Sequence, residues 1–159
     1  MSQQFGPGVW HLINVGALHP KEGRGEPRKV SLDLSAGDQQ TIMIFGTKET
    51  DNDNQKWEFQ RNDNGTYHIR NVQYGKYITF PDDDNDGKQI IATEGPREWQ
   101  VTVGHEGVNV KDPEPSIRIC HPNTKKTLEV TDHSSQDGAL VQLWEESRGK
   151  NQAWYFVAA

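Results

Sequence analysis

The chain has 159 residues, a net charge of −6 and a mean hydropathy of −0.89. This acidic balance argues against nucleic acid as the main partner, because phosphate binding needs a concentrated basic face. No run of 18 apolar residues exists, so the sequence predicts no membrane span. The length predicts one domain covering residues 1–159.

The first residues and the cysteine count bear on location. Met1 to Gln4 show no basic start followed by an apolar stretch, so we expect no secretory signal. The single cysteine, Cys120, allows no internal disulfide and fits a reducing compartment. We therefore expect a cytoplasmic protein in which Cys120, inside a strand pattern, is a buried structural thiol.

The N-terminal third of the chain contains four stretches that alternate apolar and polar residues, as half-buried strands do. They lie at 9–15, 29–34, 42–45 and 57–59 and form a first repeat, residues 9–60. A loop at 16–28, rich in glycine, proline and charge, separates the first two stretches. The residues Asn62 to Gly65 then predict a tight hairpin.

The same order of stretches recurs twice. The second repeat, residues 66–102, has expected strands at 66–72, 75–80, 89–93 and 97–101. The third, residues 116–157, has them at 116–121, 127–130, 140–144 and 154–156. No window shows an apolar face at helical spacing, so we expect no helix.

Three copies of a four-stranded unit predict an all-β fold, the β-trefoil, in which twelve short strands make a closed barrel with a hairpin cap. Each unit can bury its apolar face only by packing against the other two. Trp57, Trp99 and Trp154 close the three units, and we expect them to occupy equivalent core positions.

The motif Asn-Gln-x-Trp occurs at 54–57 and again at 151–154. Together with Leu32 to Asp38, Thr66 to Asn71 and Gly75 to Tyr77, it resembles the ricin-B-like, or R-type, lectin family in its mushroom form. The resemblance covers nearly the whole chain. It implies a β-trefoil with up to three shallow sites for galactose- or N-acetylgalactosamine-type sugars. The implied partners are glycans or glycoproteins, and the implied role is a defence-related lectin.

Such a site has a clear physical basis. A carboxylate accepts hydrogen bonds from two adjacent sugar hydroxyls, and a charged acceptor makes the stronger bond. An amide both donates and accepts, and an aromatic ring covers the apolar face of the sugar. The resemblance implies that the acid, the ring and the asparagine contact the sugar, while the glutamine steadies the acid.

Two repeats supply these groups by position. Repeat one has Asp33, Phe45, Asn54 and Gln55, with phenylalanine where tryptophan or tyrosine is more usual. Repeat three has Glu129, Trp144, Asn151 and Gln152, with an acid one methylene longer. Repeat two has Thr79 in place of the acid and Arg97-Glu98 in place of Asn-Gln, so we expect it to be blank. The alternative is that the Asn-Gln pairs only brace the loop before the last strand.

A second function stays open, that of a serine protease inhibitor. The loop at 16–28 contains Lys21, Arg24 and Arg28, and a trypsin-like S1 pocket accepts one rigidly held cation. Pro20 and Pro27 favour rigidity, whereas two glycines at 23 and 25 oppose it. A storage or scaffold trefoil without any ligand is a third reading.

Metal and cofactor chemistry is not expected. Asp82-x-Asp84-x-Asp86-Gly87 matches the start of a calcium loop, but its twelfth position is Thr93 instead of glutamate. The histidines are scattered, and no nucleophile triad or acid pair stands out, so we expect no zinc site and no enzyme. Dimerisation, or two working sites, would give a weak lectin its avidity.

Overall fold

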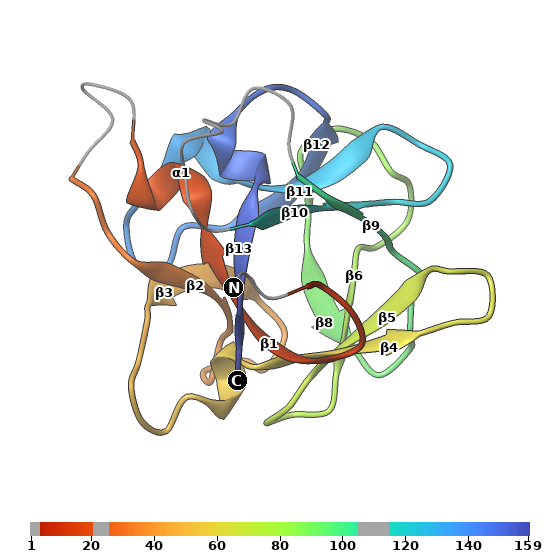
Figure 1. Cartoon of the computed structure of the whole chain (residues 1–159), viewed down its shortest axis with the longest axis horizontal. Helices are drawn as coiled ribbons and strands as arrows, with labels where there is room; N and C mark the ends of the chain where they lie inside the picture. Colours follow the sequence, from red (N-terminus) through yellow and green to blue (C-terminus); the bar gives the residue numbers. More distant parts are fainter. Residues whose placement is uncertain (1–3, 21–25, 105–114) are drawn as a thin grey trace.

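Thirteen antiparallel strands form one continuous sheet in the computed structural model, which describes residues 4–20, 26–104 and 115–159 (Figure 1). The first unit contains β1 (Gly8–Asn14), β2 (Val30–Leu34), β3 (Ile42–Gly46) and β4 (Trp57–Arg61). The second contains β5 (Tyr67–Asn71), β6 (Tyr77–Thr79), β7 (Lys88–Gln89), β8 (Ile91–Thr93) and β9 (Gln100–Val103). The third contains β10 (Ser116–Cys120), β11 (Lys126–Val130), β12 (Val141–Glu145) and β13 (Trp154–Ala158).

The three units share one hydrophobic core, which draws buried residues from each of them. The first strand, β1, pairs with the last, β13, from Trp10 opposite Ala158 to Asn14 opposite Trp154. This pairing closes the sheet between the first and the last strand of the chain (Figure 1). The predicted β-trefoil is therefore confirmed, with twelve of the thirteen strands at the predicted places.

The extra strand arises in the second unit, where one strand was expected at 89–93. The strand is interrupted there at Ile90, whose side chain is fully buried. Before the break, β7 pairs with β12 through Gln89 opposite Gln142; after it, β8 pairs with β6. A short segment thus changes partners at a core residue, which links the second unit directly to the third.

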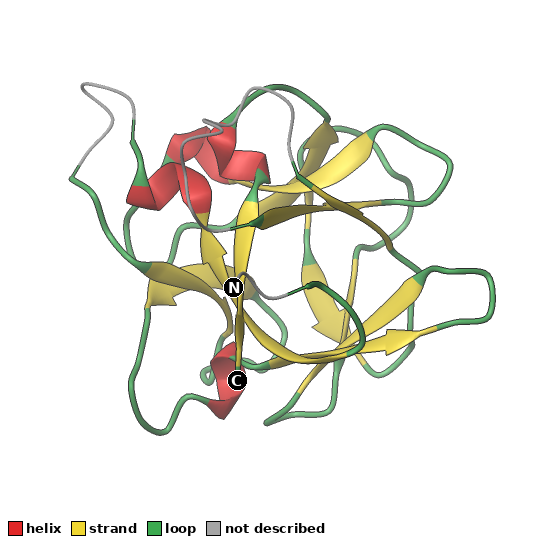
Figure 2. Ribbon diagram, viewed as in Figure 1, coloured by secondary structure: helices red, strands yellow, loops and turns green. Residues whose placement is uncertain are grey.

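Short helical turns, which the sequence did not predict, occur at four places (Figure 2). The helix α1 (Val15–Leu18) is a single turn, and the Asn14 side chain accepts a hydrogen bond from the backbone N–H of Ala17 at 3.1 Å. Three 3-10 turns follow: η1 (Asp53–Gln55), η2 (Thr131–His133) and η3 (Lys150–Gln152). One turn is too short to show a helical period in the sequence. None of the helices among the described residues could cross a membrane.

The tryptophans that end the units are completely buried, as predicted. Each indole N–H donates a hydrogen bond to a backbone carbonyl in the second strand of its own unit. The donor–acceptor distances are 3.0 Å for Trp57 to Leu32, 2.9 Å for Trp99 to Ile78 and 3.4 Å for Trp154 to Leu128. The same bond in all three units fixes the last strand against the second.

The cysteine also lies where the sequence predicted. Cys120, at the end of β10, is buried, with 6% of its surface exposed. Burial raises the pKa of its thiol, because the charged thiolate loses its hydration. A raised pKa leaves the thiol protonated and unreactive at neutral pH, as a structural cysteine should be.

Replacing Trp99 by phenylalanine should lower the free energy of unfolding by about 2–3 kcal/mol, because the Ile78 carbonyl loses its donor inside a close-packed core. The same change at Trp144, which is 41% exposed, should cost less than about 0.5 kcal/mol. Urea unfolding followed by far-ultraviolet circular dichroism measures both. Equal losses would show that the indole bond does not hold the core together.

Candidate functional site

The hairpin of β2 and β3 presents an acid and an aromatic ring on one face. Asp33 lies opposite Met43, and Ser31 lies opposite Phe45. Residues that lie directly opposite each other share a face, and so do residues two apart along a strand. Asp33 and Phe45 are therefore diagonal neighbours on the same face, which is what the predicted repeat-one site requires.

The hairpin of β11 and β12 repeats this arrangement. Glu129 lies opposite Gln142, and Thr127 lies opposite Trp144, so the acid and the indole are again diagonal neighbours. The rings of both hairpins stand open to solvent, with exposed fractions of 38% for Phe45 and 41% for Trp144. The other four tryptophans are at most 8% exposed, so Trp144 differs from them in role.

In repeat one, the turn η1 brings two amides to the acid. The Asn54 amide nitrogen donates to Asp33 Oδ1 at 3.1 Å, and the Gln55 amide nitrogen donates to Asp33 Oδ2 at 3.0 Å. Asp33 itself is 4% exposed. Each carboxylate oxygen thus has one fixed neutral donor, which orients the carboxylate without neutralising its charge.

Gln55 has no polar group left for a ligand. Its nitrogen also donates to the Gly46 carbonyl at 3.1 Å, and its oxygen accepts from the backbone N–H of Lys48 at 3.0 Å. The residue is fully buried. Gln55 therefore acts as a brace between the acid and the start of the loop after β3, a role that the sequence analysis allowed for it.

The pKa of Asp33 is raised from its ordinary value of 3.8. The main cause is burial, which disfavours the charged form. The hydrogen bonds from Gln55 and Asn54 and the positive charge of Lys48 act in the opposite direction. The two amides thus offset part of the cost of keeping a carboxylate ionised in this position.

The brace recurs in repeat three. The Gln152 nitrogen donates to Glu129 Oε1 and to the Glu145 carbonyl, both at 2.9 Å. The Gln152 oxygen accepts from the backbone N–H of Ser147 at 2.8 Å. Ser147 and Glu145 therefore correspond to Lys48 and Gly46 of repeat one.

The asparagine of repeat three does not reach the acid. The Asn151 nitrogen donates to the Val130 carbonyl at 2.9 Å, and its oxygen is buried without a hydrogen-bond partner. Gln142 takes its place and donates to Glu129 Oε2 at 2.9 Å. The longer acid can reach across to β12, where repeat one has Met43, which cannot donate. Gln142 was not among the predicted site residues, although its place two residues before Trp144 puts it opposite Glu129 on the neighbouring strand.

Repeat two has neither an acid nor an exposed ring at these positions. Thr79 occupies the place of the acid, and Thr93, opposite Tyr77, occupies the place of the ring. The Arg97 guanidinium donates to the Thr79 hydroxyl at 2.7 Å and to the Phe80 carbonyl at 3.1 Å. A cation and a hydroxyl therefore replace the amide and the carboxylate.

The assignment of Arg97-Glu98 to the Asn-Gln positions was one residue out of register. Arg97 stands two residues before Trp99, as Gln55 stands two before Trp57, so Arg97 takes the glutamine position. Its guanidinium bonds to Thr79 as the glutamine bonds to the acid elsewhere, and to the Phe80 carbonyl as the asparagine bonds to the Leu34 and Val130 carbonyls. The Glu98 carboxylate instead accepts from the Asn64 amide at 2.9 Å, in the turn between β4 and β5.

The basic loop of the inhibitor hypothesis is only partly described. Lys21 and Arg24 lie outside the described residues. The Arg28 guanidinium pairs with the Asp137 carboxylate at 2.8 Å and donates to the Ser135 carbonyl at 2.8 Å. Arg28 would have to break both contacts before it could enter the pocket of a protease.

The acidic turn at 82–87 directs its carboxylates toward separate side chains. Asp86 lies 2.6 Å from the Lys126 ammonium, and Asp84 lies 3.4 Å from the His121 ring nitrogen. Asp86 also accepts from the backbone N–H of Glu145 at 3.0 Å. Within residues 4–20, 26–104 and 115–159, no three His, Cys, Asp or Glu side chains form a metal-binding group.

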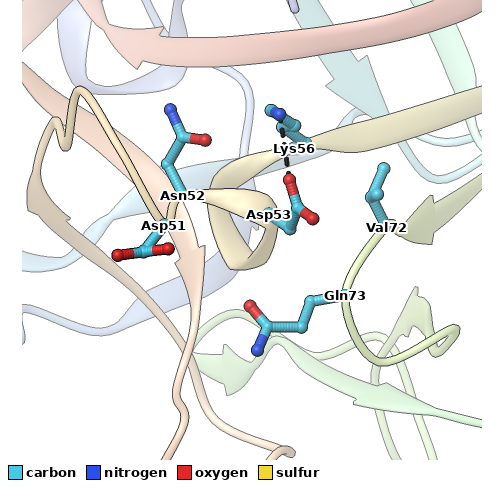
Figure 3. Close-up of a pocket in the computed structure, with 6 residues that line it drawn as sticks. All are labelled: Asp51, Asn52, Asp53, Lys56, Val72 and Gln73. Atoms are coloured by element: carbon cyan, nitrogen blue, oxygen red, sulfur yellow. Dashed lines mark ion pairs between the residues drawn. The ribbon is translucent and has the colours of Figure 1, made fainter.

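A polar hollow of about 460 Å³ lies between the η1 turn and the residues after β5 (Figure 3). Asp53 and Lys56 form an ion pair of 2.9 Å within it. Its lining consists of Asp51, Asn52, Asp53, Lys56, Val72 and Gln73. None of the predicted sugar-binding residues lines this hollow, so it is separate from the hairpin face.

The sequence matches the model of a known family, described as ricin-type beta-trefoil lectin domain-like, over residues 28–93 and 53–144. The two matches together span well over half of the chain. The chain therefore belongs to this family, and the resemblance seen in its motifs is confirmed. No curated protein matches the sequence.

Solved structures of lectins share the fold. A ricin B-like lectin of Macrolepiota procera, in complex with lactose, is 22% identical with a TM-score of 0.79, over 99% of this chain and 100% of that one. The Rhizoctonia solani agglutinin is 16% identical with a TM-score of 0.73, over 100% of each chain. The C-half of an earthworm R-type lectin, in complex with GalNAc, is 16% identical with a TM-score of 0.65, over 96% and 100%. At these identities the likeness establishes the β-trefoil.

Replacing Gln55 by alanine should lower the free energy of unfolding by about 1–3 kcal/mol, because a buried carboxylate oxygen, a carbonyl and an N–H all lose their partner. Gln60 is the matched control, since its partly exposed amide donates to Glu58 at 2.8 Å and, among the described residues, to no other group. Gln60→Ala should change the stability by less than about 0.5 kcal/mol. Thermal or urea unfolding of both variants distinguishes a brace from an ordinary polar residue, for which the two losses would be equal.

Proposed function

We propose that this protein is a lectin without catalytic activity, which binds galactose- or N-acetylgalactosamine-type glycans at the β2–β3 hairpin. The observation that carries the proposal is the braced Asp33 carboxylate beside the exposed Phe45 ring. A carboxylate offers about four lone-pair positions, and the Asn54 and Gln55 amides use two of them. Two acceptor positions remain for a pair of sugar hydroxyls, while the ring covers the apolar face of the sugar.

The low exposure of Asp33 sets a condition on the ligand. Only 4% of the residue is accessible, so the hydroxyls have to approach along a narrow path. Adjacent hydroxyls on one sugar edge can satisfy such a carboxylate together, whereas a bulky acyl group at that edge cannot. A shallow site of this kind should bind a simple sugar with a Kd of about 0.1–1 mM.

The β11–β12 hairpin is proposed as a second, weaker site. It offers the larger ring, Trp144, and the acid Glu129, which is braced by Gln152 and Gln142. Its asparagine stands apart from the acid, so one polar contact of repeat one is missing there. Two sites on one chain, or a homodimer, would raise the affinity for branched glycans or glycoproteins through avidity.

Similar lectin structures support the choice of sugars, and the single buried cysteine supports the proposed location. The proteins with a similar fold include one solved with lactose and one solved with GalNAc, which makes these sugars the first to test. A cytoplasmic location is proposed on the single, buried Cys120. The protease-inhibitor alternative stays a prediction, and the ion pair of Arg28 does not favour it.

Replacing Asp33 by alanine should abolish sugar binding at repeat one, because the acceptor that orients the sugar is removed. Thr79→Ala should leave binding unchanged, since repeat two lacks both the acid and the ring. Chemical shifts of the backbone amides near Phe45 report repeat one during a lactose titration, and those near Trp144 report repeat three and confirm that the variant is folded. If galactose, N-acetylgalactosamine and their β-linked disaccharides all fail to shift wild type at about 20 mM, the lectin proposal is wrong.

Acidification should weaken binding at repeat one before an ordinary aspartate would titrate. Burial raises the pKa of Asp33 above 3.8, so protonation begins at a higher pH and removes an acceptor as the pH falls. Asp38 is the internal control: hydrogen bonds from Thr41 and Gln40 lower its pKa to about 2. Carboxyl carbon shifts followed by NMR should place the midpoint of Asp33 above 3.8 and that of Asp38 well below it; the reverse order would contradict the structure.

A further inference from the structure

One ammonium group lies at the edge of the repeat-one site without an acidic partner. Lys48 is the second residue after β3, which ends at Gly46. Its Nζ lies 5.9 Å from the centre of the Phe45 ring. Its side chain is partly buried. Among the described residues, Lys48 forms no ion pair, whereas Lys56, Lys88 and Lys126 each pair with an aspartate.

The backbone fixes where Lys48 stands. Its N–H donates to the Gln55 oxygen at 3.0 Å, and Gln55 in turn holds Asp33. Lys48 is also a nearby positive charge for Asp33, and it acts to lower the pKa of that carboxyl against the larger, opposite effect of burial. The ammonium therefore lies over the ring and acts electrostatically on the acid, which are the two groups that would hold the sugar.

The equivalent position in repeat three has no charge. Ser147 makes the same backbone bond there, to the Gln152 oxygen at 2.8 Å. The two hairpins thus share the acid, the ring and the brace, but repeat three has an uncharged side chain in place of Lys48. The Arg118 guanidinium, which donates to the Ser147 carbonyl at 3.1 Å, is paired with Glu146. The brace tolerates either side chain, since it uses the backbone N–H alone, so the lysine is not needed to build the site.

Two other charged side chains near this edge, Arg28 and Asp51, are engaged or line another hollow. The Arg28 guanidinium lies near Gly46, but it is paired with Asp137 at 2.8 Å. Asp51, in the same loop as Lys48, lines the hollow of Figure 3. Within the part of the chain that the structure describes, Lys48 is thus a cation near the ring that forms no ion pair, in a chain whose net charge is −6.

A sugar seated on Phe45 and Asp33 would lie beside this ammonium. Covering it with neutral groups removes water from a charge, which is unfavourable. An anionic substituent would instead form a charge-assisted hydrogen bond with it. We propose that the repeat-one site prefers galactose-type glycans that carry an acidic substituent, a sulfate or a carboxylate, and that Lys48 determines this preference. The inference rests on the lectin function proposed for the same site.

The test compares sugars that differ in one substituent. Galactose, galactose 3-sulfate, galactose 6-sulfate and galacturonic acid are titrated into wild type at about 20 mM salt, and the amide shifts near Phe45 report repeat one. At least one acidic sugar should bind about threefold to fivefold more tightly than galactose, the range of a partly exposed ion pair. The preference should disappear near 1 M salt, where charges are screened within about 3 Å. Comparing the two sulfates with galacturonic acid shows whether the site prefers a sulfate or a carboxylate.

Three variants assign the preference to Lys48. In Lys48→Ser, which installs the repeat-three residue, the ratio of acidic to neutral affinity should fall to about one. Lys48→Arg should keep the ratio above one. Lys125→Ser removes an equal charge from the exposed turn before β11 and should leave the wild-type ratio unchanged.

The outcomes separate this inference from the function on which it rests. Galactose binding at repeat one without any acidic preference overturns the inference and leaves the lectin proposal standing. An acidic preference that survives in Lys48→Ser, or that disappears equally in Lys125→Ser, also overturns it. If no sugar binds, neutral or acidic, the lectin proposal fails and this inference fails with it.

Discussion

The hydrogen bond from each buried tryptophan to the second strand of its unit sets the geometry of everything built on that unit. In repeat one, the Trp57 indole bonds to the carbonyl of Leu32. The residue two places before the tryptophan then reaches the side chain of the residue after Leu32, so Gln55 meets Asp33. The same offset holds in the other units, where Arg97 meets Thr79 and Gln152 meets Glu129. The candidate site is thus a consequence of how the core is tied together.

Because the scaffold fixes positions rather than chemistry, the three units can diverge without loss of the fold. Repeat one holds a carboxylate with two amides of the same turn. Repeat three replaces one of these amides by Gln142 from the neighbouring strand. Repeat two exchanges the pair for a guanidinium and a hydroxyl, and Arg97 lies 3.9 Å from the centre of the Phe80 ring. All three solutions give the polar side chain near the end of the second strand a hydrogen-bond partner, as a buried polar group requires.

The sequence predicted most of the fold because its repeats, strand patterns and closing tryptophans are local signals that agree with one another. It also predicted which side chains meet at the repeat-one hairpin. It did not predict the change of partner at Ile90 or the role of Gln142, since both depend on which strands lie side by side. The register error at Arg97-Glu98 has another origin: without an Asn-Gln pair, only the distance to Trp99 identifies the equivalent residue.

The position of Lys48 beside the site is another feature that the sequence could not predict. In the sequence it is one of several lysines in polar loops, and nothing in its neighbours marks it. Its place becomes visible only through the brace, because the Gln55 oxygen fixes its backbone N–H while the Gln55 nitrogen fixes Asp33. The brace therefore does two things at once. It orients the acid that would receive the sugar, and it holds the backbone of Lys48, whose side chain borders the same space. Specificity can then change at that residue while the brace and the core stay as they are.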